Sequence, residues 1–318
     1  MNVGDPTNLE SGHAFGYNSS GAGKYVVPYV NSNYSSDPIY VAYGNGAEAW
    51  SKYAIDSTNF VSESGPSAAW GGTTTTNGNW VLVWQGRTSS PDRLLYHSTA
   101  TNPTAASSWA TRTAVSVGGS NVSGISRPMV TYAPVADKFV LAWVDLTSRT
   151  VRSAVATRGT TLTWQNGDDT QQRTVRGPGL ACVKGPGGTP TYDDCLLAWN
   201  YNNGIENIWS SRGWTDPNYG FGFKVSAPKP QNSADYTKLP VDVALKFDST
   251  NGGANLALMA WTAFTYPYAW FFSSKSTTSQ LTSWPAGSAP SGPGTGIVCG
   301  TSLEYSATYS EWTAVHSR

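Results

Sequence analysis

Basic side chains recur at one point of three consecutive segments of the sequence. Arg127 stands in SRP, Arg176 in VRGPG and Lys238 in TKLP. If these segments lead into the innermost strands of a closed architecture, the three cations converge on one opening and form an anion site. An arginine fork suits a planar carboxylate, because it donates two parallel hydrogen bonds. Asp242, two residues after Pro240, is the carboxylate that we expect near this opening, where it would pair with Lys238. The alternative is that each cation is a rim residue that binds a loop carbonyl.

Aromatic residues form the second chemical resource of the chain. Trp209 and Trp214 lie in NIWSSRGW, Tyr268 and Trp270 lie in YPYAWFF, and a third group is NYGFGF. Proteins hold sugars by stacking an aromatic ring on the C–H face while amides, carboxylates and hydroxyls bind the sugar hydroxyls. We therefore interpret these four residues as candidate ligand-binding residues for a glycan.

The sequence contains no clear catalytic motif. Two acids about 5 to 9.5 Å apart are needed for glycoside cleavage, and the adjacent pairs Asp168–Asp169 and Asp193–Asp194 point their side chains apart, so we interpret them as solvated turn residues. The three histidines lack metal-ligand spacing, and no nucleophile elbow, phosphate loop or zinc helix is present. The sequence indicates no metal and no cofactor.

The three cysteines allow one disulfide. Cys182 in GLACVKG and Cys195 in DDCLLAW lie in two apolar runs separated by a turn-rich linker. If these runs are neighbouring antiparallel strands, the two sulfurs face each other and form a disulfide. Cys299 is left over, and we expect it to be a buried thiol.

Composition limits the class of protein. Charged residues make up 13% of the 318 residues, and 20 Lys and Arg balance 20 Asp and Glu. No bulk positive field attracts nucleic acid or an anionic membrane, so neither is an expected partner. No run approaches the roughly 20 apolar residues of a membrane span. The start, MNVGDPTNLESG, lacks the regions of a signal peptide. We expect a soluble, secreted or extracellular protein given as a mature or trimmed segment; its oligomeric state is left open.

One apolar phrase returns along the whole chain, and it predicts the elements that position these residues. YVVPY, WVLVW, FVLAW, CLLAW, LALMAW and WTAVH follow one another at spacings of about 55 to 62 residues. Such a period is the signature of a repeat architecture. Trp84, Trp143, Trp199 and Trp261 close four of these phrases, and we expect them to fill the space between neighbouring units.

Each unit reads as four short strands. In the third, GISRPMVTY, KFVLAWVD, VRSAVAT and TLTWQNG are separated by turns. No apolar period of 3.6 persists, so helix content should be close to nil. The sequence predicts an all-β, single-domain, six-bladed β-propeller of four-stranded antiparallel blades. Its last blade is either incomplete or closed by the segment before His13, and a five-bladed ring is the alternative. The approximate repeats are 12–65, 66–123, 124–175, 176–232, 233–290 and 291–318.

Three Ser- and Thr-rich turns ahead of a Trp carry a resemblance to a known family. STATNPTAASSW, TRGTTLTW and KSTTSQLTSW resemble degenerate forms of the Asp-box hairpin of sialidase-like propellers. None keeps the Asp, and TRGTTLTW keeps the closing Thr163 and Trp164. The resemblance implies a propeller with an inner-channel arginine cluster for a sugar carboxylate, which Arg127 and Arg176 match. The organisation also resembles that of six-bladed lectins.

The sequence therefore predicts a secreted β-propeller that recognises a glycan or glycoconjugate, as a lectin-like domain or as the glycan-binding module of a larger secreted protein. One alternative is a sialidase-like glycoside hydrolase acting on an anionic sugar, and the other is a protein-interaction platform. Whether the chain catalyses a reaction is left open.

Overall fold

The structure is a computed structural model. It describes residues 16–17, 25–30, 38–44, 50–62, 64–72, 78–86, 93–187, 189–201, 207–216, 222–223, 229–230, 241–247, 255–265, 268–275, 301–306 and 311–316.

The described strands form six sheets, each made mainly of antiparallel neighbours. The first sheet contains β1 (Gly16–Tyr17), β2 (Tyr25–Val30), β3 (Ile39–Gly44) and β4 (Trp50–Ala54). The second contains β5 (Ser67–Gly71), β6 (Asn79–Gln85), β7 (Leu95–Ala100) and β8 (Thr113–Ala114). The third contains β11 (Met129–Ala133), β12 (Lys138–Val144), β13 (Thr150–Thr157), β14 (Trp164–Arg173), β9 (Ser116–Val117) and β10 (Ser120–Asn121).

The remaining three sheets follow in chain order. The fourth contains β15 (Gly179–Lys184), β16 (Asp193–Asn200), β17 (Ile208–Thr215), β18 (Gly222–Phe223) and β19 (Lys229–Pro230). The fifth contains β20 (Asp242–Lys246), β21 (Leu256–Thr265) and β22 (Tyr268–Lys275). The sixth contains β23 (Thr301–Ser306) and β24 (Glu311–His316).

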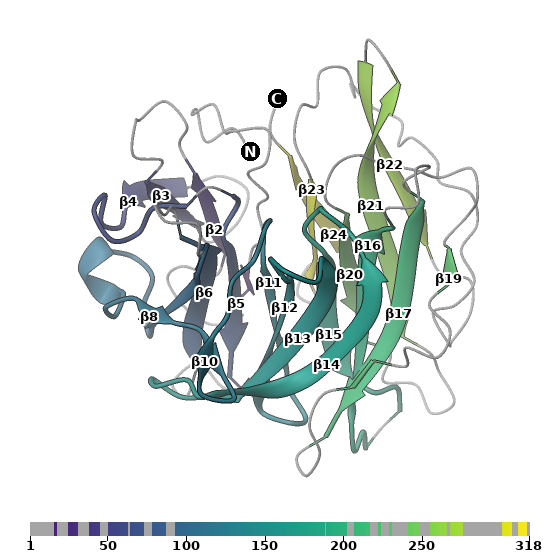
Figure 1. The fold of residues 1–318 in the computed structure, drawn as a ribbon, viewed down its shortest axis with the longest axis horizontal. Helices are drawn as coiled ribbons and strands as arrows, with labels where there is room; N and C mark the ends of the chain where they lie inside the picture. The colour runs from purple at the N-terminus through teal and green to yellow at the C-terminus, as the bar shows by residue number, and fades with distance from the viewer. Residues whose placement is uncertain are drawn as a thin grey trace.

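The sheets are arranged around a common middle. In Figure 1 the strands β11, β12, β13 and β14 step outward from the centre, as do β20, β21 and β22. The first strands of consecutive sheets contact one another, since β5 meets β11, β11 meets β15, β15 meets β20 and β20 meets β23. Each sheet therefore presents its first strand inward and its broad faces to its neighbours.

The recurring tryptophans lie between sheets, as the sequence predicted. Trp84, Trp143, Trp199 and Trp261 are 0–2% exposed, and each belongs to a buried cluster that includes the preceding sheet. Their partners from that sheet include, in order, Val41, Val81, Val155 and Leu196. β6 and β16 are buried along their whole length, because a sheet covered on both sides needs apolar residues on both faces.

The described residues agree with the expected lack of helix, and their strands differ from the expected ones in two places. In the described residues the helical content is one 3₁₀ turn, Ala106–Ser108, in agreement with the sequence. The hairpin β9–β10, expected within the second unit, instead joins the third sheet, because β9 pairs with β14 through Val117 and Trp164. β14 also continues past the expected strand to Arg173. Cys299 and the segment before His13, which was one of two alternatives for completing the last blade, lie outside the described residues.

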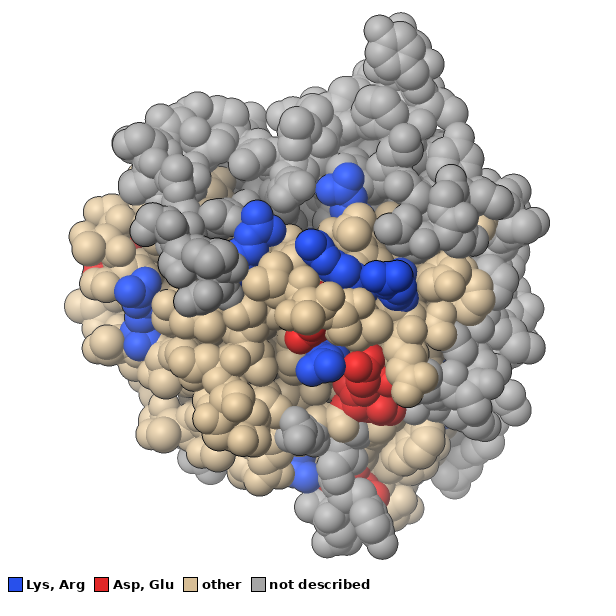
Figure 2. Space-filling model, in the orientation of Figure 1, with Lys and Arg blue, Asp and Glu red and all other residues tan. Residues whose placement is uncertain are grey.

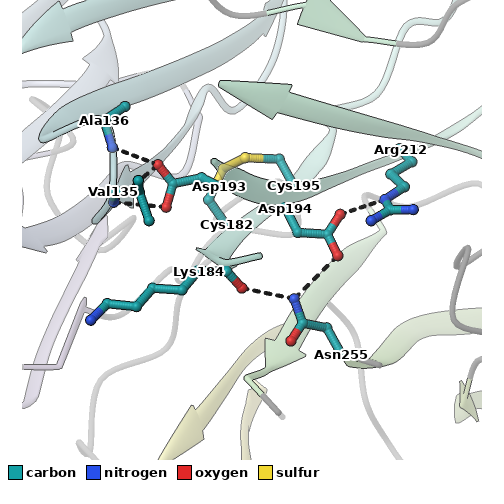
Figure 3. The surroundings of a disulfide bond; sticks show 9 residues. All are labelled: Val135, Ala136, Cys182, Lys184, Asp193, Asp194, Cys195, Arg212 and Asn255. Carbon is teal, nitrogen blue, oxygen red and sulfur yellow. Dashed lines mark hydrogen bonds and ion pairs between the residues drawn. A yellow bond between two sulfur atoms is a disulfide. The ribbon is translucent and has the colours of Figure 1, made fainter. Parts of the chain in front are cut away.

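A disulfide and two buried carboxylates fix the fourth sheet (Figure 3). Cys182 and Cys195 are cross-strand neighbours in β15 and β16, and they are bonded as a disulfide. Asp193 accepts the backbone N–H groups of Val135 (2.9 Å) and Ala136 (2.8 Å), in the turn between β11 and β12 of the third sheet. These contacts join neighbouring sheets through backbone donors.

Asp194 points the opposite way (Figure 3). It accepts from Arg212 Nε at 2.5 Å and from the amide of Asn255, next to β21 of the fifth sheet, at 3.2 Å. Asp193 and Asp194 are 0% and 1% exposed, so the expectation of solvated turn residues is wrong for this pair, although the two side chains do diverge. Burial raises the pKa of both carboxyls, that of Asp193 to about 6.

No helix in the described part of the chain is long and apolar enough to cross a membrane.

Candidate functional site

A cleft of about 510 Å³ opens at one rim of the third sheet, and we call it the rim cleft. Its described walls come from the β9–β10 hairpin and the segment after it, the end of β12 with the following turn, the start of β13, and the middle of β14. The lining residues are Val117, Ser120, Asn121, Val122, Ser123, Trp143, Asp145, Leu146, Thr147, Arg152, Ser153, Gly167, Asp168 and Asp169. The volume lies within the range of small-molecule sites.

An irregular strand pairing creates this cleft. The register between β13 and β14 shifts on both sides of Arg152, and Gln171 has a left-handed backbone (φ 56°). A Cβ at Gly167 would lie 2.6 Å from Ser153 Oγ, so only glycine lets β14 pass this close. Ser153 Oγ in turn accepts the N–H of Asp168 at 2.8 Å. The bulge leaves Asp168 and Asp169 on the cleft wall, because bulges re-aim side chains.

Arg152 is held between two carboxylates. Its Nε donates to Asp169 Oδ2 at 3.2 Å, and its Nη1 lies 3.6 Å from Asp145 Oδ2. The second oxygen of each carboxylate is fixed by the backbone, since Asp145 Oδ1 accepts from Ser148 N (2.8 Å) and Asp169 Oδ1 from Gln171 N (2.8 Å). In the part of the chain that the structure describes, no acceptor contacts Nη2 of Arg152, and the side chain is 43% exposed, so this donor is accessible from solvent.

The cleft lining is polar and carries more negative than positive charge. Asp145, Asp168 and Asp169 line the cleft with one guanidinium, that of Arg152, and with hydroxyls of Ser and Thr. Trp143 is the cross-strand neighbour of Arg152 and is 2% exposed, so the indole is a buried part of the cleft wall. Such walls offer both donors and acceptors to a hydroxylated ligand and repel an anionic one.

The predicted anion site has a different form. Arg127 is 1% exposed; its Nη2 donates to the carbonyl of Val241 at 3.3 Å, while Nε and Nη1 are buried and have no hydrogen-bond partner among the described residues. Burial lowers the pKa of Arg127, and the charge of Asp242 opposes this shift. Asp242, at the start of β20, is 1% exposed. The structure thus buries two opposite charges, Arg127 and Asp242, near each other and away from solvent.

Of the other two predicted cations, the structure describes Arg176. Arg176 is half-buried just before β15, and its N–H donates to Thr174 Oγ1 at 3.1 Å. Lys238 lies outside the described residues. Lys and Arg side chains gather near the middle of the face shown in Figure 2, and most of the described surface there is uncharged.

The predicted aromatic residues separate into three cases. Trp214 is 45% exposed and lines a second pocket, of about 490 Å³. Trp209 is half-buried, packs against Tyr201 with ring centroids 4.8 Å apart, and belongs to the core beside Trp199. Tyr268 and Trp270 lie on β22, of which the structure describes the backbone at these two positions and not the side chains.

Sequence reasoning missed the rim cleft. Arg152 interrupts the apolar pattern of VRSAVAT, and Asp145 stands two residues after Trp143, which closes the recurring phrase; these were the available signals. The Asp168–Asp169 pair was noted but interpreted as a solvated turn, whereas it lies half-buried in β14. The bulge that turns this pair to the cleft depends on contacts with β13, which the local pattern does not show.

Comparisons with known proteins give no sequence family. No protein-family model matches the chain, and no curated protein matches it. Solved structures do match. The fucose-specific lectin from Aleuria aurantia (mercury derivative) has a TM-score of 0.60 at 10% identity, over 98% of this chain and 93% of that one. Another structure of the Aleuria aurantia lectin, described as a six-bladed β-propeller, has a TM-score of 0.56 at 10% identity, over 98% and 93%.

The chain has a β-propeller fold. A variant of the same lectin in complex with α-methyl-L-fucoside has a TM-score of 0.57 at 9% identity, over 98% of this chain and 97% of that one. At these identities the likeness concerns the fold, and the ligand has to be argued from this chain's own residues.

Proposed function

We propose that this chain is a lectin-like β-propeller that binds a neutral carbohydrate in the rim cleft. The observation that carries the proposal is the lining of the cleft: three carboxylates, one guanidinium and several hydroxyls beside a buried indole. Sugar hydroxyls both donate and accept hydrogen bonds, so they can donate to Asp145, Asp168 or Asp169 and accept from Arg152. Hydrogen bonds to charged groups are the stronger ones in such sites.

The proposal favours a neutral sugar over an anionic one. A sialic acid carboxylate in the rim cleft would meet three aspartates and a single arginine, Arg152, which two of them, Asp145 and Asp169, already engage. Arg127, which the sialidase-like alternative places on the substrate, is buried against Val241. Like charges brought together cost several kcal/mol (roughly 4 at an effective dielectric of 20), which disfavours the anionic-sugar hydrolase.

The similar solved structures support carbohydrate as the ligand class. The lectin from Aleuria aurantia is fucose-specific, and its variant was solved with a fucoside. Because identity is near 10%, no contact residue is carried over. Fucosides are nevertheless a natural first set of sugars to examine.

The proposal also includes a closed ring of six blades, export from the cell, and a role either as a free lectin or as a module of a larger protein. The even spacing of the recurring phrase supports the ring. The disulfide and the low charge content support an extracellular site of action, since disulfides persist in oxidising compartments.

A glycan array with a parallel assay for released reducing sugar tests this function. The protein should be made in a host without N-glycosylation, because Asn121 lines the cleft and begins the sequon NVS. We expect binding to neutral glycans, no release of sugar, and no preference for sialylated ones. Release of sugar would instead indicate a hydrolase, and absence of any glycan binding would favour a protein-interaction platform.

The variant Arg152→Gln locates the site. It removes donors to the ligand while its ion pairs are partly exposed, so the fold should lose little. We expect affinity to fall by about 10-fold or more, because a hydrogen bond to a charged group contributes roughly 1.5–3 kcal/mol. Arg158→Gln is the matched control: Arg158 also pairs with an aspartate, Asp137, at the other end of β13. Equal losses in both variants would contradict the assignment.

A further inference from the structure

The second pocket lies on the fourth sheet, and we call it the Trp214 pocket. It has a volume of about 490 Å³, and its described lining consists of Thr191, Tyr192, Arg212, Trp214 and Asp216. A ring, a guanidinium, a carboxylate and hydroxyls therefore share one small opening. Unlike the rim cleft, this pocket has an exposed aromatic ring, and it has one carboxylate (Asp216) and one guanidinium (Arg212).

An exposed tryptophan is unusual in this molecule. Trp214 is 45% exposed, whereas the recurring tryptophans are 0–2% exposed, and in the described residues the other exposed large apolar side chain is Val175. An indole left partly in water forgoes some of the free energy that its burial would contribute. Tryptophan is enriched at binding surfaces, because its ring offers a large apolar face and its N–H can stay in contact with water.

The walls beside Trp214 are rigid. Arg212 stands two residues before it on β17, so both side chains lie on one face of the strand, and Arg212 Nε donates to the buried Asp194 at 2.5 Å. The ring of Tyr192 lies against Gly185, where an added Cβ would come within 2.9 Å of its Cζ atom. A site whose side chains are held before the ligand arrives loses less entropy on binding.

The two sites lie at opposite ends of one strand. Lys138, at the start of β12, donates from Nζ to the carbonyl of Asp216 at 3.4 Å, next to the Trp214 pocket. Trp143 and Asp145, at the end of β12, line the rim cleft. Six steps along a strand span about 20 Å, which is too far for one sugar ring to occupy both.

We propose that the Trp214 pocket is a second carbohydrate-binding site, in which a sugar ring stacks its C–H face on the indole of Trp214 while Asp216, Thr191 and Arg212 bind its hydroxyls. This inference rests on the proposed carbohydrate-binding function and extends it. With sites at both ends of β12, one chain cross-links two glycans, and multivalent engagement of a glycosylated surface needs no oligomer.

Fluorine NMR of protein labelled with 5-fluorotryptophan reads the two sites separately. Trp214→Phe assigns the signal of the pocket, Trp143→Phe assigns that of the rim cleft, and the fully buried Trp199 is the internal control. The probes are methyl α-L-fucoside, methyl β-D-galactoside, methyl α-D-mannoside and N-acetylglucosamine. We expect at least one of them to shift the Trp214 signal in a saturable way, and to do so equally in Arg152→Gln, where the shift of the Trp143 signal is lost.

The outcomes separate this inference from the proposed function. If the Trp143 signal titrates and the Trp214 signal does not, the second site is wrong and the rim cleft stands. If Arg152→Gln abolishes both shifts, the pocket has no independent site and the inference is overturned. If neither signal moves with any probe, both proposals fail. A Trp214 shift without a Trp143 shift supports the pocket and removes the rim cleft.

Discussion

Charged residues are few in this chain, and some of them are buried and stabilise the fold while others are accessible on the surface. Arg127 with Asp242, and Asp194 with Arg212, are buried or half-buried combinations of opposite sign. Asp193 is satisfied by backbone N–H groups instead. Because a buried charge is costly without a partner, the partners determine which aspartates and arginines are available to a ligand. Those of the rim cleft, with Arg152 43% exposed on its side chain, are available.

His97 gives a prediction at the scale of one residue. It is 5% exposed, it accepts from Trp164 Nε1 at its Nδ1 (3.4 Å), and burial lowers its pKa to about 4. The folded state therefore keeps His97 neutral while the unfolded chain binds a proton below about pH 6.5. The stability that it contributes is present above pH 6.5 and is lost as pH falls toward 4.

Denaturation by urea at pH 7 and pH 5 measures this effect. Wild type should lose about 2 kcal/mol more than His97→Gln between the two values, by proton linkage. The opposite pH dependence of Asp193, whose pKa is raised, is present in both proteins and cancels in the difference. Equal losses in the two proteins would show that His97 titrates normally.

At the scale of elements, the second strands of the sheets were the most predictable part. Their continuous apolar runs, such as KFVLAWV, carry the reason for their burial on both faces within the sequence itself. The β9–β10 hairpin and the bulge of β14 were not predictable, because their pairing is set by contacts with other strands, such as that of Gly167 with Ser153. The recurring positions of Arg127, Arg176 and Lys238 are visible in the sequence. The burial of Arg127 is not, because it depends on how the inner strands pack.

The contacts of Asp193 lead to a prediction about how the β11–β12 turn of the third sheet depends on β16 of the fourth. In Asp193→Ala the N–H groups of Val135 and Ala136 lose their acceptor in the turn between β11 and β12. We expect a loss of about 2 kcal/mol of unfolding free energy, because a buried donor left unsatisfied costs roughly 1–3 kcal/mol. Hydrogen exchange of these two amides should accelerate. Asp193→Asn, which keeps one carbonyl oxygen, should show a smaller change, and unchanged amide exchange in Asp193→Ala would exclude this link.

At the scale of the whole molecule, the indole-bearing strands β6, β12, β16 and β21 pack the second to fifth sheets each on the sheet before it, around inner strands that contact one another. The likeness to lectin propellers agrees with this arrangement. The period of the recurring phrase made the architecture predictable from sequence. The sites were less predictable, because they form at strand ends where residues from different units meet, as Val117 and Arg152 do in the rim cleft.

The central claim is that the rim cleft holds a neutral sugar, and a crystal structure of the protein with its best glycan from the array tests it most directly. The account predicts electron density for a sugar ring in the cleft, with hydroxyls within hydrogen-bond distance of Arg152 and of at least one of Asp145, Asp168 and Asp169. Density for the glycan elsewhere, with the cleft empty, would contradict it.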